Sequence, residues 1–250
     1  MKTVVLACVA AAAPLGLVAS AASADVLNMT IVIRDFRAFG TTDGHPDFEA
    51  FGADDRGMVG LALGADGTPV YQGAPTTPTT TGAANFAQWY HDVPGVNQTF
   101  VQTIPLDNGQ ATPGGVYTYT NNEFFPIDGL GWGNQGNNHN FHFTVQAHTT
   151  FTYQAGQVFN FTGDDDLWVY INRTLVIDLG GVHGAEGASV NLDTLGLVAG
   201  NTYDFDLFFA ERHTSASTFA ISTSIPIPTP SAAAVLGLGA AAAIGRRRGR

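Results

Sequence analysis

The chain of 250 residues is short of cysteine and lysine, with Cys8 and Lys2 its sole examples of each. Both lie close to the N-terminus, at the start of an apolar segment. A protein that loses this segment contains no thiol, so disulfides and a cysteine nucleophile are excluded. Its fold then depends on a hydrophobic core, or on a core together with a metal ion.

Positive charge is scarce throughout residues 25–230. This segment holds all 21 acidic residues and only five basic ones, so its net charge is −16. The basic residues are Arg34, Arg37, Arg56, Arg173 and Arg212. A surface of this sign repels a phosphate backbone, so no nucleic-acid partner is expected. Cations and neutral sugars are compatible with it.

The common signatures of hydrolytic and phosphate-transferring enzymes are also missing. The sequence contains no G-x-S-x-G elbow, no H-E-x-x-H zinc motif and no P-loop. A pair of carboxylates such as Asp165 and Glu211 would suit a glycosidase in principle. Adjacent acids on one loop are more typical of metal ligands than of an acid and a nucleophile on opposite sides of a bond. We therefore predict a non-enzymatic protein. A polysaccharide-active glycosidase ranks third, behind the two non-enzymatic hypotheses given at the end of this section.

The N-terminus has the pattern of a secretory signal. Lys2 precedes an apolar run over residues 4–18, and the small residues 22–24 follow as an A-x-A type cleavage site. We predict a signal peptide over residues 1–24. A lipoprotein signal ending at Cys8 is the alternative, although the apolar run continues beyond that residue.

The C-terminal residues 226–250 have three parts. Alternating prolines from Pro226 to Pro230 lead into an apolar run of residues 232–244 and then an arginine cluster. The run is shorter than the roughly 20 residues that span a membrane, and the arginines fit the positive-inside preference. The layout resembles the PEP-CTERM sorting tail of Gram-negative bacteria, with Thr229 where that family usually has glutamate. The resemblance implies a Pro-rich linker and sorting tail, membrane contact through this tail alone before processing, and cleavage near Pro230 by an exosortase-type protease.

Between the two ends the sequence alternates apolar and polar residues with the period of β-strands. Aromatic residues supply ample core material, with 17 Phe, 7 Tyr and 3 Trp. The predicted strands cover residues 26–33, 140–148, 167–171, 175–177, 203–209 and 219–225. Asn172 and Arg173 form a predicted hairpin turn, residues 83–91 a short helical turn, and residues 64–82 a loop. We predict one all-β domain over residues 25–225, a single antiparallel β-sandwich of jelly-roll type with long loops and no second core.

Three consecutive carboxylates, Asp164, Asp165 and Asp166, directly precede an aromatic-rich strand. Like charges repel and are costly to desolvate, so the run needs either full solvation or a cation. Nearby aromatic residues indicate a partly buried loop, which favours a metal over a solvated turn. Clustered carboxylate oxygens are the ligands that Ca²⁺ prefers.

Two further loops carry polar residues at the ends of apolar strands. Glu211, Arg212 and His213 follow one strand, where they form either an exposed ion pair or part of a metal and ligand site. Residues 178–183 end in two glycines, a valine and His183, which fit either a tight turn or a ligand contact. His139 and His142 are three apart, which is a poor spacing for zinc on a strand, and we interpret both as structural.

Several long segments together resemble the fibro-slime domain, a secreted module of bacteria and slime moulds. The matching segments span about residues 29–225 and comprise residues 45–48, 124–129, 139–143, 163–172, 175–183 and 206–215. That family is in turn similar to the protective-antigen-type β-sandwich of adhesins and glycosidase-associated modules. There, an Asp-Asp pair binds Ca²⁺, which binds sugar hydroxyls.

The resemblance implies a calcium site and a ligand surface around it. The Asp-Asp pair falls on Asp164 and Asp165, and Glu211 stands where a second loop commonly supplies asparagine. The expected ligand-binding residues are Asp166, Trp168, His183, Arg212 and His213. The predicted protein is an exported module of the extracellular matrix or outer cell surface of a Gram-negative bacterium. It binds extracellular polysaccharide or another glycan in a Ca²⁺-dependent way, or alternatively is a structural matrix protein in which calcium only stabilises the fold.

Overall fold

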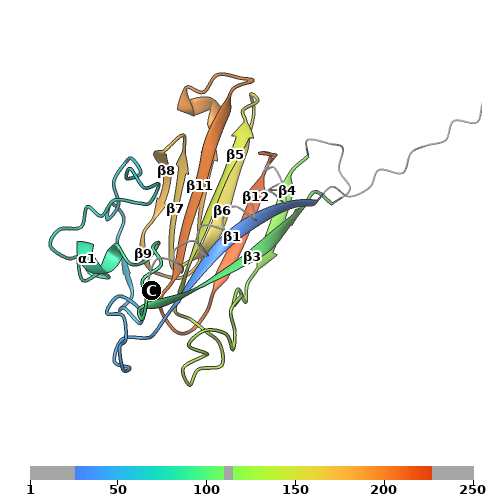
Figure 1. Ribbon diagram of the computed structural model, residues 1–250. Helices are drawn as coiled ribbons and strands as arrows, with labels where there is room; N and C mark the ends of the chain where they lie inside the picture. The colour runs from blue at the N-terminus through green and yellow to red at the C-terminus, as the bar shows by residue number, and fades with distance from the viewer. Residues whose placement is uncertain (1–25, 110–114, 227–250) are drawn as a thin grey trace, which may run out of the picture.

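A computed structural model describes residues 26–109 and 115–226 of the chain. The predicted signal peptide and all but the first residue of the predicted sorting tail lie outside these residues. The described part is almost wholly β-structure joined by long loops (Figure 1). Within it, no helix has the length and apolar character needed to cross a membrane.

Ten strands form one sheet in which every pairing of neighbouring strands is antiparallel. In spatial order they are β10 (Glu186–Asn191), β6 (Val158–Asp164), β12 (Thr218–Thr223), β4 (Tyr117–Asn121), β3 (Asn97–Asp107), β1 (Val26–Phe36), β5 (Phe143–Thr152), β11 (Thr202–Glu211), β7 (Asp166–Ile171) and β8 (Thr174–Leu179). β2 (Ala53–Asp54) and β9 (Gly181–Val182) form a separate two-stranded ribbon. The remaining elements are the short helix α1 (Ala83–Phe86) and the 3₁₀-helix Leu192–Leu195.

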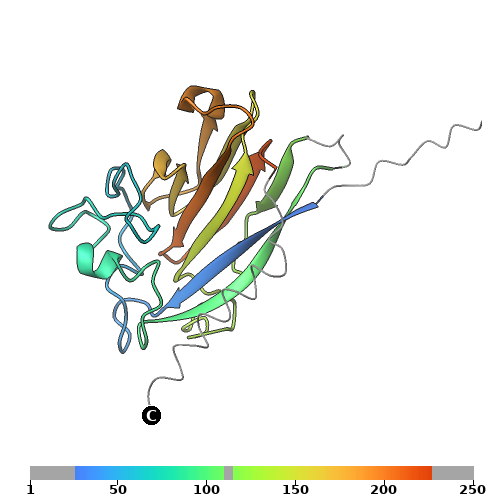
Figure 2. The ribbon, with the colours of Figure 1, turned by 45° about the horizontal axis from the view of Figure 1, so that its top comes forward.

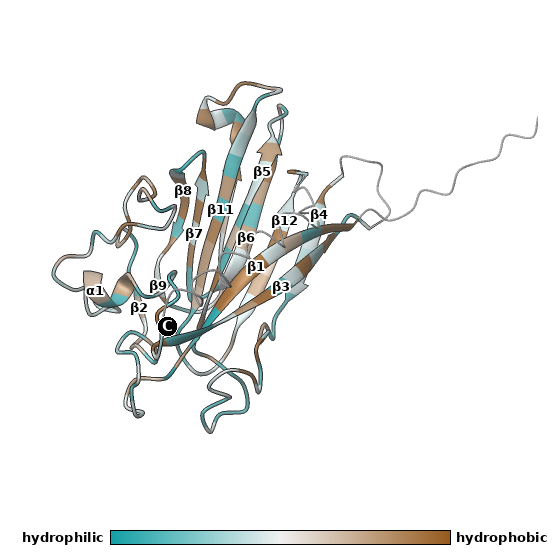
Figure 3. Ribbon diagram, in the orientation of Figure 1, coloured by the Kyte–Doolittle hydropathy of each residue, from teal (hydrophilic) through white to brown (hydrophobic). Residues whose placement is uncertain are grey.

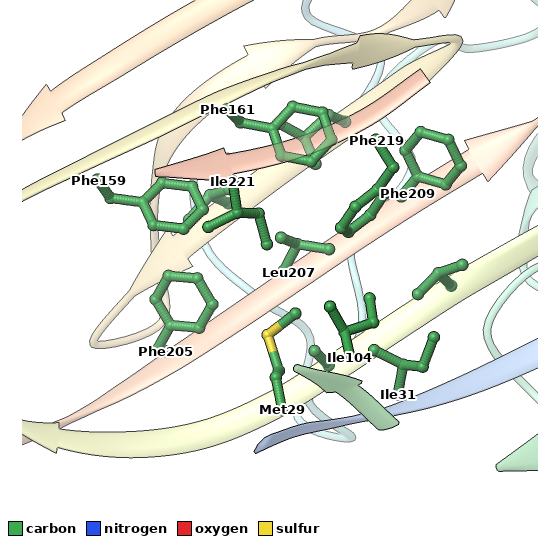
Figure 4. Packing of buried hydrophobic residues seen from close by; sticks show 14 of the residues in the cluster. Met29, Ile31, Ile104, Phe159, Phe161, Phe205, Leu207, Phe209, Phe219 and Ile221 are labelled. Carbon is green, nitrogen blue, oxygen red and sulfur yellow. The ribbon is translucent and has the colours of Figure 1, made fainter. Parts of the chain in front are cut away.

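The ten-stranded sheet curls until its two end strands, β8 and β10, contact one another (Figure 2). Its concave face encloses the main hydrophobic cluster, to which nearly every strand contributes alternate residues. Figure 4 shows phenylalanines of β6, β11 and β12 packed against aliphatic residues of β1 and β3. Burying aromatic and branched side chains on one face is what the period-2 pattern demands, so the all-β, sandwich-like prediction is confirmed.

A second hydrophobic cluster lies on the outer face of the sheet. Trp168 and Tyr170 of β7 and Phe208 of β11 are fully buried there. Residues 37–96, which include α1, cover them with Phe86 and Trp89, among others (Figures 1 and 3). The expectation of a single core was therefore wrong: the sheet is covered on both faces over β7 and β11. We call residues 37–96 the covering segment.

The hairpin between β7 and β8 has the predicted two-residue turn. Asn172 and Arg173 have φ angles of 49° and 64°, the left-handed pair that matches the twist of a tight hairpin. Arg173 is an unusual residue for this conformation, and its guanidinium donates to the carbonyl of Leu63 at 3.4 Å. The covering segment thus holds the turn from outside.

Candidate functional site at one end of the sandwich

The three polar loops singled out in the sequence meet at one end of the sandwich. Asp165 joins β6 to β7, residues 180–183 follow β8, and residues 211–217 link β11 to β12. Asp165 connects all three, because its Oδ1 accepts from the backbone N–H of His183 at 3.2 Å and its Oδ2 from that of Arg212 at 3.0 Å. Segments far apart in the sequence are thereby fixed around one carboxylate.

Asp164 and Asp165 are both buried and are joined by a cis peptide bond. Asp164 accepts a hydrogen bond from the backbone N–H of Thr218. Burial raises the pKa of Asp164 above its usual range and raises the pKa of Asp165 to about 7, against the opposing effect of the Arg212 charge. The expected burial of the acidic run is confirmed, but a partly buried loop is not what carries it: Asp164 ends β6, Asp166 begins β7, and Asp165 alone joins them.

Glu211 lies at the end of β11, fully buried beside the two aspartates. Its Oε1 accepts weakly from the backbone N–H of His213 at 3.5 Å, and its Oε2 has no hydrogen-bond partner among the described residues. Burial, reinforced by the charge of Asp165, raises the pKa of Glu211 well above the usual value for glutamate. The nearby Ser217 hydroxyl opposes this rise, but its Oγ makes no hydrogen bond of acceptable geometry with Glu211. A buried carboxylate oxygen without a donor is costly unless a proton or a cation neutralises it.

Asp166 forms a buried ion pair with Arg212. Arg212 Nε donates to Asp166 Oδ2 at 2.6 Å and Nη2 to Oδ1 at 3.1 Å, and neither side chain has any exposed surface. Nη1 donates to the carbonyl of Thr79 at 2.6 Å, and the guanidinium lies 4.7 Å from the ring centroid of Trp89. The alternative of an exposed pair at Arg212 is wrong, because the covering segment encloses it.

Burial also corrects part of the expected ligand surface. Asp166 and Arg212 neutralise one another, and Trp168 is fully buried with its Nε1 donating to Asp178 at 2.9 Å. These three residues have no surface open to a ligand. Their position gives them the role of a rigid support behind Asp164 and Asp165.

The two remaining predicted contacts, His183 and His213, do reach the surface. Both line a cavity of about 240 Å³ together with Asp164, Asp165 and the loop residues around them. The ring of His183 contacts the carbonyl oxygens of Gly184 at 2.9 Å and Leu179 at 3.3 Å. His213 Nδ1 lies 3.2 Å from Glu49 Oε1. The cavity therefore combines carboxylate and imidazole groups at its walls.

The covering segment contributes residues that the sequence gave no reason to join to this site. Glu49 Oε2 accepts from His142 Nε2 at 2.7 Å, and its Oε1 accepts from the hydroxyl of Thr214 at 2.7 Å. Asp47 and Thr79 offer backbone carbonyls to Arg212. Asp47 lies in one of the segments that resemble the fibro-slime domain, but Thr79 belongs to a loop with no motif. No local pattern indicates which loop covers a strand.

The structural interpretation of the histidine pair agrees with their surroundings. His139 stacks on Phe125 with ring centroids 4.0 Å apart and bonds to Asp128 at 2.6 Å. His142 is buried against Glu49, and burial lowers its pKa despite that hydrogen bond. In the described part of the chain, no three His, Cys, Asp or Glu side chains are already arranged as a metal-binding group.

The second half of the chain matches a known protein family. Residues 112–234 match the PA14 domain. That match includes the acidic run, the glycine loop of β8 and β9 and the loop after β11, so all three parts of the site lie within it. It does not include β1, β3 or the covering segment.

The chain also has relatives over most of its length. It is 43% identical over 212 residues to protein psiR of Dictyostelium discoideum and 45% identical over 183 residues to psiQ of the same organism. These alignments cover 78% and 68% of this chain but 21% and 18% of psiR and psiQ, so the chain spans about a fifth of either relative. Among solved structures, the PA14 sugar-binding domain from an RTX adhesin is 13% identical, with 45% of this chain and 78% of that chain covered and a TM-score of 0.31.

Proposed function

We propose that this chain, which carries a PA14 domain over residues 112–234, is a non-enzymatic adhesive module that binds carbohydrate through Ca²⁺. Asp164, Asp165 and Glu211 would hold the ion at the end of the sandwich after their side chains turn toward one another, since in the described structure they are not arranged as a metal-binding group. The single observation that carries the proposal is the unpartnered, buried Oε2 of Glu211 next to two buried aspartates. The sequence resemblance to adhesin-type β-sandwiches supports the same function.

The charges around the site support a cation there. Asp164, Asp165 and Glu211 all have pKa values raised by burial. The Arg212 charge opposes this rise at Asp165, but both side-chain bonds of Arg212 to a carboxylate go to Asp166. Carboxylate oxygens are hard ligands at the end of rigid strands, and these residues therefore fit Ca²⁺ better than a soft metal.

Each residue has a separate role in the proposed site. The backbone N–H groups of His183 and Arg212 fix the plane of Asp165, and each of its oxygens keeps a further lone pair for a ligand. Thr218 orients Asp164 in the same way. A bound Ca²⁺ supplies coordination positions for sugar hydroxyls, and His183 and His213 border the cavity in which such a sugar would lie.

Calcium titration with thermal unfolding tests the metal. If Ca²⁺ binds the folded state alone, a free Ca²⁺ concentration of 100 times its Kd stabilises that state by about 2.7 kcal/mol. Tm then rises by several degrees. Asp165→Ala should abolish the shift, whereas Asp107→Asn, at the far end of β3, should retain it. Glu211→Gln should raise Tm in chelator, because it removes a buried charge, while weakening the response to Ca²⁺. An unchanged Tm in millimolar Ca²⁺ overturns the metal proposal.

A glycan array separates adhesion from a purely structural role for calcium. The structural alternative is favoured by the way Asp165 already ties three loops together. Stabilisation by Ca²⁺ without any bound glycan would select it. Turnover of a polysaccharide that is lost in Asp164→Asn would instead support the glycosidase.

We also propose export to the matrix or outer cell surface, with the glycan as the partner there. The signal peptide and the PEP-CTERM-like tail carry this proposal, including processing by an exosortase-type protease in a Gram-negative host. The relatives psiR and psiQ come from a eukaryote, so the bacterial host rests on the tail alone. The intact mass of the exported protein tests cleavage at both ends.

A further inference from the structure

A groove of about 370 Å³ lies in the covering segment beside the candidate site. One wall is the threonine-rich stretch of residues 76–81, and the other consists of residues around Glu49 with Phe39 and Phe51. The hydroxyls of Thr77, Thr79, Thr80 and Thr81 already bond to other groups of the protein, whereas Thr76 is exposed, so the groove offers this threonine and the two aromatic rings. This combination differs from the carboxylate-lined cavity next to it.

Phe39 and Phe51 are exposed to an unusual degree for phenylalanine. Their exposed fractions are 63% and 89%, while most phenylalanines of the chain are buried in one of the two clusters. A single exposed apolar residue is ordinary, but two aromatic rings at the border of one groove form a patch that solvation disfavours. Such a patch is typical of a surface that contacts another molecule.

The backbone that carries these rings is held firmly from behind. Glu49 adopts a left-handed φ of 77°, and its N–H donates to the carbonyl of Arg212 at 2.6 Å. The N–H of Phe39 donates to the carbonyl of Phe48 at 2.7 Å, and Phe48 stacks on Phe36 in the outer cluster with centroids 4.2 Å apart. The rings therefore project from a fixed platform, which lowers the entropy lost on binding.

The groove adjoins the cavity of the candidate site, because residues that line one contact or follow residues that line the other. Glu49 lines the groove and pairs with His213, which lines the cavity. Phe51 borders the groove and its neighbour Gly52 borders the cavity. The carbonyl of Thr79, in the groove wall, accepts a hydrogen bond from the guanidinium of Arg212, whose backbone N–H donates to Asp165. The groove and the cavity are therefore neighbours on one face of the protein.

We propose that this groove is a second carbohydrate subsite, which takes the sugar next to the one at the carboxylate cavity. The ligand would then be a saccharide chain of two or more residues. The C–H groups on a pyranose face carry slight positive charge and pack against the negative face of an aromatic ring, while its hydroxyls can bond to the exposed Thr76. This inference rests on the proposed carbohydrate binding.

The charge of the groove defines the class of saccharide. Its lining includes one acid, Glu49, and no basic residue. The protein between residues 25 and 230 is strongly acidic as well. A uronic-acid or sulfated polymer would be repelled without any compensating arginine or lysine. The subsite therefore fits a neutral saccharide.

An array that presents monosaccharides and oligosaccharides of the same linkage series, neutral and acidic, tests the subsite in Ca²⁺. The full-length protein should bind neutral oligosaccharides more tightly than the matching monosaccharides. Phe51→Ala should weaken oligosaccharide binding by about 3- to 10-fold and leave monosaccharide binding unchanged. Val198→Ala is the matched control, because Val198 is exposed near the other end of β11. Unchanged Tm values show that both variants fold.

The outcomes distinguish the subsite from the proposed function. If the wild type binds both lengths equally and Phe51→Ala changes neither, carbohydrate binding stands and the subsite is refuted. If Phe51→Ala affects only self-association in light scattering, the patch is a contact between copies and the subsite is again refuted. If the wild type binds no glycan of either length, the proposed function fails and the subsite fails with it.

Discussion

Replacing Arg212 by methionine removes the cation that neutralises the buried carboxylate of Asp166, while most of the side-chain volume remains. Arg212 also donates to the carbonyls of Asp47 and Thr79 in the covering segment. The variant therefore breaks a charge pair and a hydrogen-bonded link between the sheet and the segment that covers it. We expect a large loss of folding stability.

The magnitude follows from the charge that is left behind. Breaking a fully buried ion pair by removing one partner costs about 3–5 kcal/mol. Asp166 can escape part of that cost by taking up a proton, which at pH 7 costs about 4 kcal/mol for a carboxyl whose unfolded pKa is about 3.9. Two orphaned carbonyl acceptors add to the loss. We therefore expect a decrease of about 4 kcal/mol in the free energy of unfolding, a large share of the 5–15 kcal/mol of a typical domain.

Urea unfolding in the presence of a chelator measures this loss without any contribution from metal. Arg56→Met is the matched control, because Arg56 is 43% exposed at its side chain and pairs with Asp54 at 2.8 Å. An exposed pair of this kind is worth about 0–1 kcal/mol. Comparing the two variants therefore distinguishes the effect of losing a buried ion pair from the effect of losing an exposed one.

The pH dependence adds a second check. In Arg212→Met the pKa of Asp166 in the folded state lies further above that of the unfolded state, because burial already raises it and the opposing charge is gone. The folded state then holds a proton that the unfolded state releases above about pH 4, so the penalty grows with rising pH. The difference from wild type should shrink between pH 7 and pH 4. A loss below 1 kcal/mol, or one independent of pH, would refute the assignment of Asp166 as a buried, arginine-neutralised carboxylate.

Two further predictions concern positions away from the candidate site. Gly131→Ala should destabilise the protein by more than Gly129→Ala, because a Cβ at Gly131 would lie 2.0 Å from Asp35 Oδ2 whereas one at Gly129 meets nothing within 4 Å, and both have positive φ. In chemical denaturation, the free energy of unfolding should fall by about 1 kcal/mol in the control Gly129→Ala and by several kcal/mol in Gly131→Ala. Equal losses in the two variants would contradict the close packing of Gly131 against Asp35. The hydrogen bond of 2.6 Å to Asp206 raises the pKa of His148 above 6.5, so its stabilising effect is complete below pH 6.5 and is lost as pH rises through the raised pKa. NMR titration should show this pKa falling toward 6.5 in Asp206→Asn, and an unchanged value would exclude the pair.

Local patterns in the sequence predicted β1, β5, β7, β8, β11, β12 and the turn between β7 and β8, but not β3, β4, β6 or β10. Alternation placed Phe205, Leu207 and Phe209 on a common face, and all three lie in the main cluster. Phe208 alternates with that set, on the face that carries Asp204 and Asp206, where nothing in the local pattern calls for burial. Phe208 is instead buried, because a segment more than a hundred residues earlier covers it.

The sequence indicated which loops meet at the candidate site but not the partners of their side chains. Asp165 and Glu211 were identified from their positions at strand ends, and the structure brings their loops together. The pairing of Asp166 with Arg212 depends on the antiparallel register of β7 and β11 and on enclosure by the covering segment. Both are non-local, so no spacing within either motif predicts them. Strand order has the same origin, since loop closure and not propensity decides which strands meet.

The strand order also determines how the protein can be divided. The PA14 match begins at residue 112, yet β1 and β3, which precede it, occupy the middle of the sheet between β4 and β5. A fragment limited to residues 112–234 would therefore retain two separate groups of strands, with the long β5 unpaired along one side. Open edges of this kind recruit other chains, so such a fragment should aggregate. Any recombinant binding module cut from this protein needs residues 26–107 as well, because they close the sheet.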